Sequence, residues 1–210
     1  MGIYGYKDGL VNAKAIQLGQ KRLVRDTYPW VRSSATAIKT AFDAKGSAAI
    51  TVGTALEAPR TLKFVNALQA TSERRVKIVV NGYDAQGNPI AELFHLSTGA
   101  TTPTRGSKAF SYVESFTPLG ATKGYGTYST VGLFPTDTFG LTEYCETQSD
   151  VLNVILFGGT AGALYKSSPS IVTATTFSKT YQTVNLVGLG AQGSTMSILY
   201  RSKFQRKLDA

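Results

Sequence analysis

The residue types most often found at catalytic and metal sites are scarce in this sequence. His95 is the only histidine and Cys145 the only cysteine, and 50 positions separate them without a recognisable local motif. A thiol nucleophile needs a neighbouring base, and protein metal centres usually take three or four side-chain ligands. We therefore expect neither a catalytic thiol nor a metal site, and we interpret Cys145 as a structural residue. A single cysteine also excludes a disulfide within the chain.

Carboxylates could supply acid–base chemistry of another kind. Five of them could be combined on paper into the acid pair of a glycosidase: Glu143 and Glu146 near Asp150, or Asp84 with Glu92. A chain with 13 acids offers such pairs by chance. The single tryptophan, Trp30, is also far from all five acids in the sequence, so no Trp-rich cleft is indicated around them. The spacing therefore favours no catalytic pair.

A glycine motif near the C-terminus raises the possibility of a nucleotide cofactor. Residues 188–193 read Gly-Leu-Gly-Ala-Gln-Gly, which matches the Gly-x-Gly-x-x-Gly pattern of dinucleotide-binding folds. That pattern must open a helix, whereas the residues that follow, 194–200, are typical of a strand. We interpret the motif as a glycine-rich β-turn, expect no cofactor, and predict that the chain is not an enzyme.

Positive charge is concentrated at the two ends of the chain. Residues 1–39 hold seven Lys or Arg against two acids and residues 196–210 hold four against one, while the residues between are close to neutral. Spread bases of this kind suit contact with an acidic protein surface or with phosphate. Because aromatic residues and Arg dominate interface cores, we predict partner contacts at Tyr4, Tyr6, Arg22, Arg25, Tyr28, Trp30, Arg32, Arg201, Lys203, Arg206 and Lys207.

The middle of the chain is typical of β-structure. Residues 75–80 alternate valine and isoleucine with basic residues, Asp84 and Gly87 suit a turn, and residues 90–96 supply a return strand, which together predict an antiparallel hairpin. Further strands are predicted at 48–52, 61–65, 108–116, 151–157, 171–177, 183–187 and 196–201. Short connections favour antiparallel pairing, so the predicted fold is an all-β sandwich or barrel of about eight or nine strands.

The regions outside these strands complete the predicted organisation. Residues 1–46 are predicted to form an extended basic arm with a possible short helix at 34–44, residues 47–200 a β-sandwich body, and residues 201–210 a basic tail. Within the body, residues 120–149 are interpreted as a long loop excursion. The N-terminus shows no secretory signal and no stretch is apolar enough to span a bilayer, so a soluble intracellular product without membrane contact is expected.

The hairpin carries a resemblance to a known group of proteins. Residues 76–92, with their Gly-x-Asp-x-x-Gly-Asn turn, and the following Gly106-Ser-Lys-Ala-Phe110 segment resemble a pattern in β-sandwich virion proteins of tailed bacteriophages. The similarity spans residues 76–117. It implies a virion component made in the host cytoplasm, either a capsid decoration or cement protein or a neck or tail subunit, with other virion subunits as partners and a homo-oligomeric state.

Two other functions stay open on the sequence. The basic ends could bind nucleic acid, since the segment 200–207 mixes aromatic and basic residues as such proteins do. Alternatively, the aromatic residues between Tyr125 and Tyr144 could form a receptor- or carbohydrate-binding surface. Of these functions, attachment to acidic subunit surfaces fits the charge pattern best.

Overall fold

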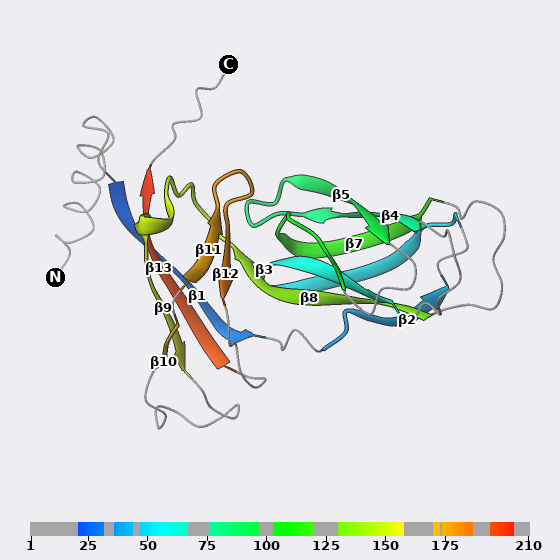
Figure 1. Ribbon diagram of the computed structural model, residues 1–210, viewed down its shortest axis with the longest axis horizontal. Coiled ribbons are helices and arrows are strands. Elements are labelled where there is room, and N and C mark those ends of the chain that lie inside the picture. The colour runs from blue at the N-terminus through cyan, green and yellow to red at the C-terminus, as the bar shows by residue number, and fades with distance from the viewer. Residues whose placement is uncertain are drawn as a thin grey trace, which may run out of the picture.

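The computed structural model is built of antiparallel strands in two sheets (Figure 1), which confirms the predicted all-β, sandwich-like class. It describes residues 21–31, 36–43, 47–66, 76–96, 103–119, 130–157, 170–172, 174–186 and 194–203. The strands are β1 (Lys21–Val31), β2 (Lys39–Asp43), β3 (Ile50–Asn66), β4 (Val76–Tyr83), β5 (Pro89–Leu96), β6 (Thr104–Arg105), β7 (Phe110–Pro118), β8 (Thr130–Gly140), β9 (Val151–Phe157), β10 (Ser170–Val172), β11 (Ala174–Ser178), β12 (Thr183–Leu186) and β13 (Ser194–Lys203). A single turn of 3-10 helix, η1 (Gln148–Asp150), precedes β9.

The strands form one sheet of four and one of nine. Sheet A has the order β1-β13-β9-β10, and sheet B has the order β11-β12-β8-β3-β7-β4-β5, with β2 paired to β8 and β6 to β3. All pairs are antiparallel. No helix of the described residues is long and apolar enough to cross a membrane.

Sheet B curls around the larger of two hydrophobic cores, which we call core 1. The rings of Phe64 on β3 and Phe94 on β5 meet edge-on with centroids 4.9 Å apart, although β7 and β4 separate their strands in the sheet order. Phe42 and Phe116 join the same aromatic cluster. Such contacts are possible only because the sheet bends back on itself, and we call this part of the molecule the large lobe.

Core 2 lies under the inner face of sheet A. Tyr28, Val154, Ile198 and Tyr200 of sheet A pack there against side chains of β8, β11 and β12, such as Phe139. We call this part the terminal lobe, because β1 and β13 are the first and last described strands. In Figure 1 it occupies the left side of the molecule.

Two strands run through both lobes and join them. β3 contributes Leu62 to core 1 and Ala58 to core 2, and β8 contributes Leu133 to core 1 and Phe139 to core 2. At the junction Arg60 is fully buried, with its guanidinium 4.8 Å from the ring centre of Phe139.

Polar partners surround the Arg60 guanidinium. Its Nε donates to the Thr136 carbonyl at 2.6 Å, and its terminal nitrogens contact Glu57 and Asp137 at 3.2 Å each. A buried guanidinium is tolerated only when its donors are paired in this way.

The predicted hairpin is confirmed, and its turn residues have specific tasks. The Asp84 carboxylate accepts hydrogen bonds from the main-chain N–H groups of Gln86 and Asn88 at 2.9 and 2.8 Å. Gly87 has a φ of +80°, which side chains disfavour. A Cβ on Gly82 would lie 2.1 Å from the Tyr112 carbonyl, so any side chain at position 82 would collide with the main chain of β7. These residues, which carry the phage resemblance, therefore build the fold.

Glu92 joins β5 to the turn before β7. Its carboxylate accepts a hydrogen bond from the Ser107 N–H at 2.6 Å and one from the Lys108 N–H at 3.3 Å. A Cβ on Gly106 would lie 2.4 Å from this carboxylate, which explains the glycine of the second motif segment. Burial raises the pKa of Glu92, although the two N–H groups oppose that rise.

The predicted arm is wrong for the part of it that the structure describes. Residues 21–31 are strand β1, and residues 39–43, which fall within the possible helix, are strand β2. β1 does not show the usual alternation of apolar inward and polar outward residues, because Asp26 and Tyr28 point into the protein while Leu23 points to solvent. A strand was therefore not predicted there. Residues 201–203 of the predicted tail likewise belong to β13.

The predicted excursion at 120–149 is also wrong over much of its length. Residues 130–140 form β8, which is central in sheet B. Pro135 argued against a strand in the sequence, because proline is rare in a strand that is paired on both sides. It is tolerated here because β2 pairs with residues 130–133 and β12 with 138–140, leaving Pro135 between them.

Strand β3 is longer than its sequence pattern predicts. The turn expected between residues 52 and 61 is an irregular stretch of one strand, with register shifts against β7 and a Gly53 φ of +59°. β-Bulges of this kind bend a strand without ending it. The bend lets β3 serve both cores.

Candidate protein-binding face

The pairing of β1 with β13 brings basic residues from both ends of the sequence together within the described part of the chain. Lys21 lies opposite Lys203 in the register, and Leu23 lies opposite Arg201. The charge pattern of the sequence predicts basic contacts at both ends but not that they share one surface. The structure places the described ones on neighbouring strands of sheet A.

Sheet A has an inner and an outer face because side chains alternate along each strand. Val24, Asp26 and Tyr28 point inward from β1, and Met196, Ile198 and Tyr200 point inward from β13. Residues of the opposite parity form the outer face. Four of these, Leu23, Arg25, Leu199 and Arg201, make up what we call the Arg/Leu face.

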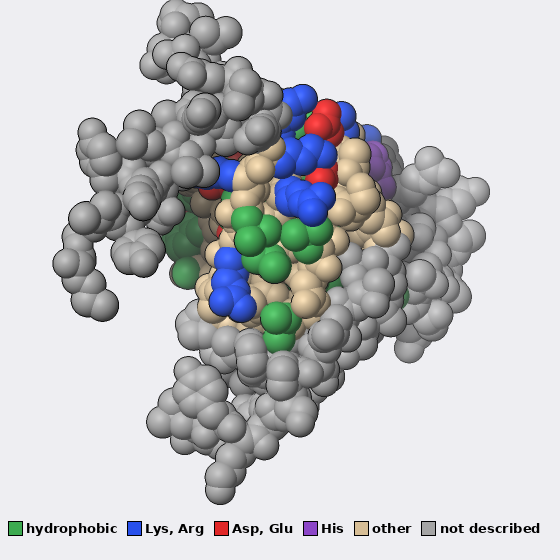
Figure 2. All heavy atoms as spheres, turned by 90° about the vertical axis from the view of Figure 1, so that its left-hand side faces the viewer, with side chains coloured by type: hydrophobic (Ala, Val, Ile, Leu, Met, Phe, Trp, Pro, Cys, Tyr) green, Lys and Arg blue, Asp and Glu red, His purple; other side chains and the backbone are tan. Residues whose placement is uncertain are grey.

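The Arg/Leu face has a checkerboard arrangement. Leu23 is opposite Arg201 and Arg25 is opposite Leu199, so the two arginines are diagonal neighbours on strands β1 and β13, with Cα atoms roughly 7–8 Å apart. Leu23 is 63% exposed, and both arginines are exposed. Figure 2 views this side of the molecule, where basic and apolar side chains lie next to each other.

The two arginines have no acidic partner among the described residues. The ion pairs of this region belong instead to other bases, namely Lys21, Arg22 and Lys203. Arginine is enriched at protein interfaces, and a contact here would also remove exposed Leu23 from water.

Acidic residues of the segment 143–150 hold the adjacent end of sheet A. Lys21 Nζ lies 2.6 Å from Asp150 and 3.7 Å from Glu146, and Lys203 Nζ lies 3.4 Å from Glu146. The hydrogen bond to Asp150 raises the pKa of Lys21. Burial would raise the pKa of Asp150, but hydrogen bonds from Lys21 and Thr147 outweigh it and lower that pKa.

A buried polar network supports the sheet from beneath. The Asp26 carboxylate accepts hydrogen bonds from the Tyr200 hydroxyl at 3.1 Å and from the Thr142 hydroxyl and N–H at 2.5 and 3.1 Å. The Tyr200 hydroxyl in turn accepts from the Glu143 N–H at 3.0 Å. Burial raises the pKa of Tyr200, so its hydroxyl stays protonated and can donate. β1 and β13 are thus fixed to the 141–143 segment.

The predicted contact residues divide into three groups. Arg25, Arg201 and Lys203 are exposed on the outer face of sheet A. Tyr28 is buried in core 2 and Arg22 is paired with Glu143, so neither is presented as predicted. Trp30 is described only as a backbone position of β1, and the rest lie outside the described residues: Tyr4, Tyr6, Arg32, Arg206 and Lys207. Exposed Leu23 was missed because a lone leucine among bases gives no binding signal.

Among the residues weighed for catalysis, Cys145 and the five acids contact other residues of the fold. His95 is exposed on β5 of the large lobe, whereas Cys145 is buried in core 2, so the structure does not bring them together. Burial raises the pKa of the Cys145 thiol, which disfavours a thiolate. All five weighed acids are engaged: Asp84 and Glu92 with main-chain N–H groups, and Glu143, Glu146 and Asp150 with basic side chains.

No metal cluster of three or more ligands forms among the described residues. The glycine motif at 188–193 lies outside them. Of the residues named for a carbohydrate surface, Tyr125 also lies outside, and Tyr144 is half-buried beside β13, where its carbonyl accepts from the Lys203 N–H at 3.1 Å.

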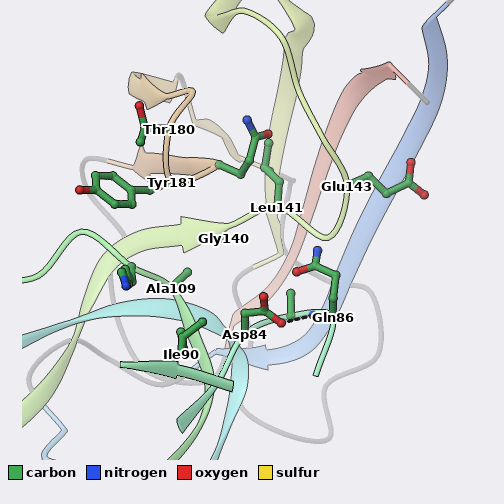
Figure 3. A pocket seen from close by; sticks show the side chains of 12 residues that line it. Asp84, Gln86, Ile90, Ala109, Gly140, Leu141, Glu143, Thr180 and Tyr181 are labelled. Carbon is green, nitrogen blue, oxygen red and sulfur yellow. Dashed lines mark hydrogen bonds between the residues drawn. The ribbon is translucent and has the colours of Figure 1, made fainter. Parts of the chain in front are cut away.

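A cleft of about 370 Å³ lies between the lobes. Asp84 and Gln86 of the hairpin turn line one side, Leu141 and Glu143 another, and Tyr181 a third (Figure 3). The Gln86 side chain donates to the Thr142 carbonyl at 2.5 Å and so ties the hairpin turn to the 141–143 segment. Since Asp84 and Glu143 are also engaged, we interpret the cleft as a seam between the lobes.

Because the comparisons with known proteins identify no relative, a function can be argued only from this geometry. No protein-family model, curated protein or solved structure matches the chain.

Proposed function

We propose that this chain is a non-enzymatic structural protein of a tailed-phage virion, which attaches to an acidic surface of a neighbouring subunit through the Arg/Leu face. The observation that carries the proposal is the diagonal pair Arg25 and Arg201, exposed beside Leu23 and without an acidic partner among the described residues. The phage setting rests on the resemblance of the hairpin segment alone.

The chemistry of the face supports a carboxylate partner. A guanidinium offers a planar fork of donors that matches a carboxylate, and two of them a short distance apart can bind two acidic side chains. Exposed Leu23 adds apolar contact to that recognition. The structural roles of the weighed acids and of Cys145 support a function without catalysis.

Nucleic acid is the competing partner for the same bases. Single-stranded nucleic acid is usually bound by aromatic platforms together with positive charge. Among the described outward-facing side chains of sheet A, none is aromatic, while leucines lie between the arginines. The composition of the face therefore supports a protein partner.

Binding to purified phage particles tests the proposal. The double variant Arg25→Glu/Arg201→Glu should reduce occupancy on particles at least tenfold, because it places acids against acids. The matched control is Lys39→Glu/Lys179→Glu, which makes the same charge change at two exposed lysines of β2 and the β11–β12 turn. It should leave occupancy unchanged.

Three results would count against the proposal. The wild-type protein could be absent from particles, or both double variants could lose occupancy equally, which would indicate a general charge effect. A steep fall of duplex DNA binding with salt, removed by the Arg25→Glu/Arg201→Glu variant, would assign the face to nucleic acid instead.

A further inference from the structure

A row of three side chains crosses the outer face of sheet B in the large lobe. Lys63 of β3 lies between Arg105 of β6 and Phe134 of β8, directly opposite each of them in the strand register. Leu62 and Phe64, the neighbours of Lys63 along β3, point into core 1, so the row points away from that core. We call these three residues the Lys/Arg/Phe row.

The main chain holds the two bases of the row beside each other. β6 pairs with β3 at Thr104 and Arg105, and the Gly106 N–H donates to the Leu62 carbonyl at 2.8 Å. Directly opposite residues of an antiparallel pair have Cβ atoms roughly 4.5–5.5 Å apart. Two like charges in this position destabilise a sheet, so the pair would gain from an anion that binds both.

No acid among the described residues forms an ion pair with either base of the row. Burial lowers the pKa of half-buried Lys63, and the charge of exposed Arg105 lowers it further. The charge of Asp137 opposes this, but Asp137 is bonded to buried Arg60 at 3.2 Å. The row therefore has two positive charges without a paired acid in the described part of the chain.

The third member of the row adds an aromatic ring. Phe134 is half-buried, and the Lys63 ammonium lies 5.9 Å from its ring centre. A Cβ on Gly132 would come within 2.6 Å of the ring, so glycine at that position lets the ring lie against β8. Aromatic rings on a sheet next to positive charge are typical of proteins that bind single-stranded nucleic acid.

We infer that the Lys/Arg/Phe row binds single-stranded nucleic acid, with a phosphate held by Lys63 and Arg105 and a neighbouring base packed on the Phe134 ring. The guanidinium fork matches phosphate oxygens, and the ammonium donates as a second point charge. An acidic protein side chain could neutralise the same bases, but it would make no use of the ring. The ring is the reason for choosing nucleic acid.

This site is separate from the Arg/Leu face and does not depend on the proposed attachment. Its residues lie on β3, β6 and β8 of sheet B, whereas Arg25 and Arg201 lie on β1 and β13 of sheet A. β3 and β8 run side by side through the large lobe, and β1 and β13 lie at the other side of the molecule (Figure 1). The two faces can therefore be tested independently.

Fluorescence anisotropy of a short labelled oligothymidylate, titrated with the full chain, gives the main readout. Lys63→Gln/Arg105→Gln should weaken binding at least tenfold. Phe134→Leu, which keeps an apolar side chain but removes the ring, should weaken it at least fivefold. The matched control is Lys77→Gln/Lys179→Gln, which removes the same charge at two exposed lysines and should change binding less than twofold.

Salt dependence separates the two parts of the site. Each phosphate neutralised on a single strand contributes about −0.7 to the slope of log K against log salt. Lys63→Gln/Arg105→Gln should therefore make this slope less steep, whereas Phe134→Leu should weaken binding without changing it. Inorganic phosphate should compete with the oligonucleotide for the wild-type chain.

Several outcomes would overturn the inference. The wild-type chain could bind no oligonucleotide, or inorganic phosphate alone, or an acidic peptide in its place. Equal losses in the charge variant and in Lys77→Gln/Lys179→Gln, with circular dichroism matching the wild type, would indicate a general charge effect. Binding that survives Lys63→Gln/Arg105→Gln but is lost in Arg25→Glu/Arg201→Glu would place nucleic acid on sheet A, and would count against the proposed function as well.

Discussion

The large lobe and the terminal lobe are stabilised in different ways. Core 1 of the large lobe is a cluster of phenylalanines and aliphatic side chains from β2, β3, β4, β5, β7 and β8, all within residues 42–133. The terminal lobe depends on contacts between the chain ends, including the bond of Tyr200 to Asp26, 174 positions away. The proposed Arg/Leu face lies on the second lobe, whose order depends on distant and partly polar contacts.

The pairing of β1 with β13 joins strands more than 160 positions apart, the longest separation among the described strand pairs. Local contacts form at low cost in chain entropy, whereas distant contacts must first close a long loop.

Arg60 is the residue whose loss should affect both lobes most. Arg60→Met removes a buried guanidinium and leaves Thr136, Glu57 and Asp137 without it, so we expect a loss of about 3–5 kcal/mol in the free energy of unfolding. Denaturant unfolding followed by circular dichroism measures this loss. Lys63→Met, on the same strand but half-buried, is the control and should change stability by less than about 1 kcal/mol. Equal effects of the two substitutions would show that Arg60 does not join the lobes.

Tyr200→Phe should separate the two lobes. It deletes the hydroxyl between Asp26 and the Glu143 N–H, for an expected cost of about 1–3 kcal/mol. Hydrogen exchange should become faster in β1 and β13 and stay unchanged in β4 and β5. Tyr181→Phe, at a side chain 44% exposed, should have no such effect. Faster exchange throughout the chain would mean that the lobes open as one unit.

Glu92→Gln should change the pH dependence of the large lobe, with the smallest effect of the three. Because burial raises the pKa of Glu92 in the folded state, the folded chain binds this proton more tightly than the unfolded chain does. Its contribution is therefore most favourable at low pH and declines as pH rises through the folded pKa.

Unfolding of both proteins between pH 4 and neutral pH measures the effect. The stability of the wild type relative to Glu92→Gln should fall as pH rises. Glu114→Gln, at an exposed carboxylate of β7, is the matched control. A stability difference that rises with pH would contradict a raised pKa at Glu92.

Sequence patterns were informative where alternation and turn chemistry agree. The β4–β5 hairpin was predicted because Val80 and its even-numbered neighbours face core 1 while Asp84 and Gly87 suit the turn. β9 was predicted with its observed bounds. These elements are specified by neighbours along the chain, which a sequence displays directly.

The Arg/Leu face could be predicted only in part. Basic residues at both ends were noticed, and Arg25 and Arg201 were among those proposed as contacts, but their adjacency arises from β1–β13 pairing across most of the chain. β1 was not predicted as a strand, because its inward-facing Asp26 is polar. The partners of Asp26, Thr142 and Tyr200, lie far away in the sequence. Long-range polar pairing leaves no local pattern.

The position of β13 between β1 and β9 has a consequence for biosynthesis. During translation the large lobe can fold while β1 still lacks its neighbour, because residues 194–203 are made last among the described strands. A prematurely terminated chain would carry the hairpin and core 1 but not Arg201 or the sheet that presents Arg25. Under the proposed function, attachment through the Arg/Leu face would require that translation has passed Arg201.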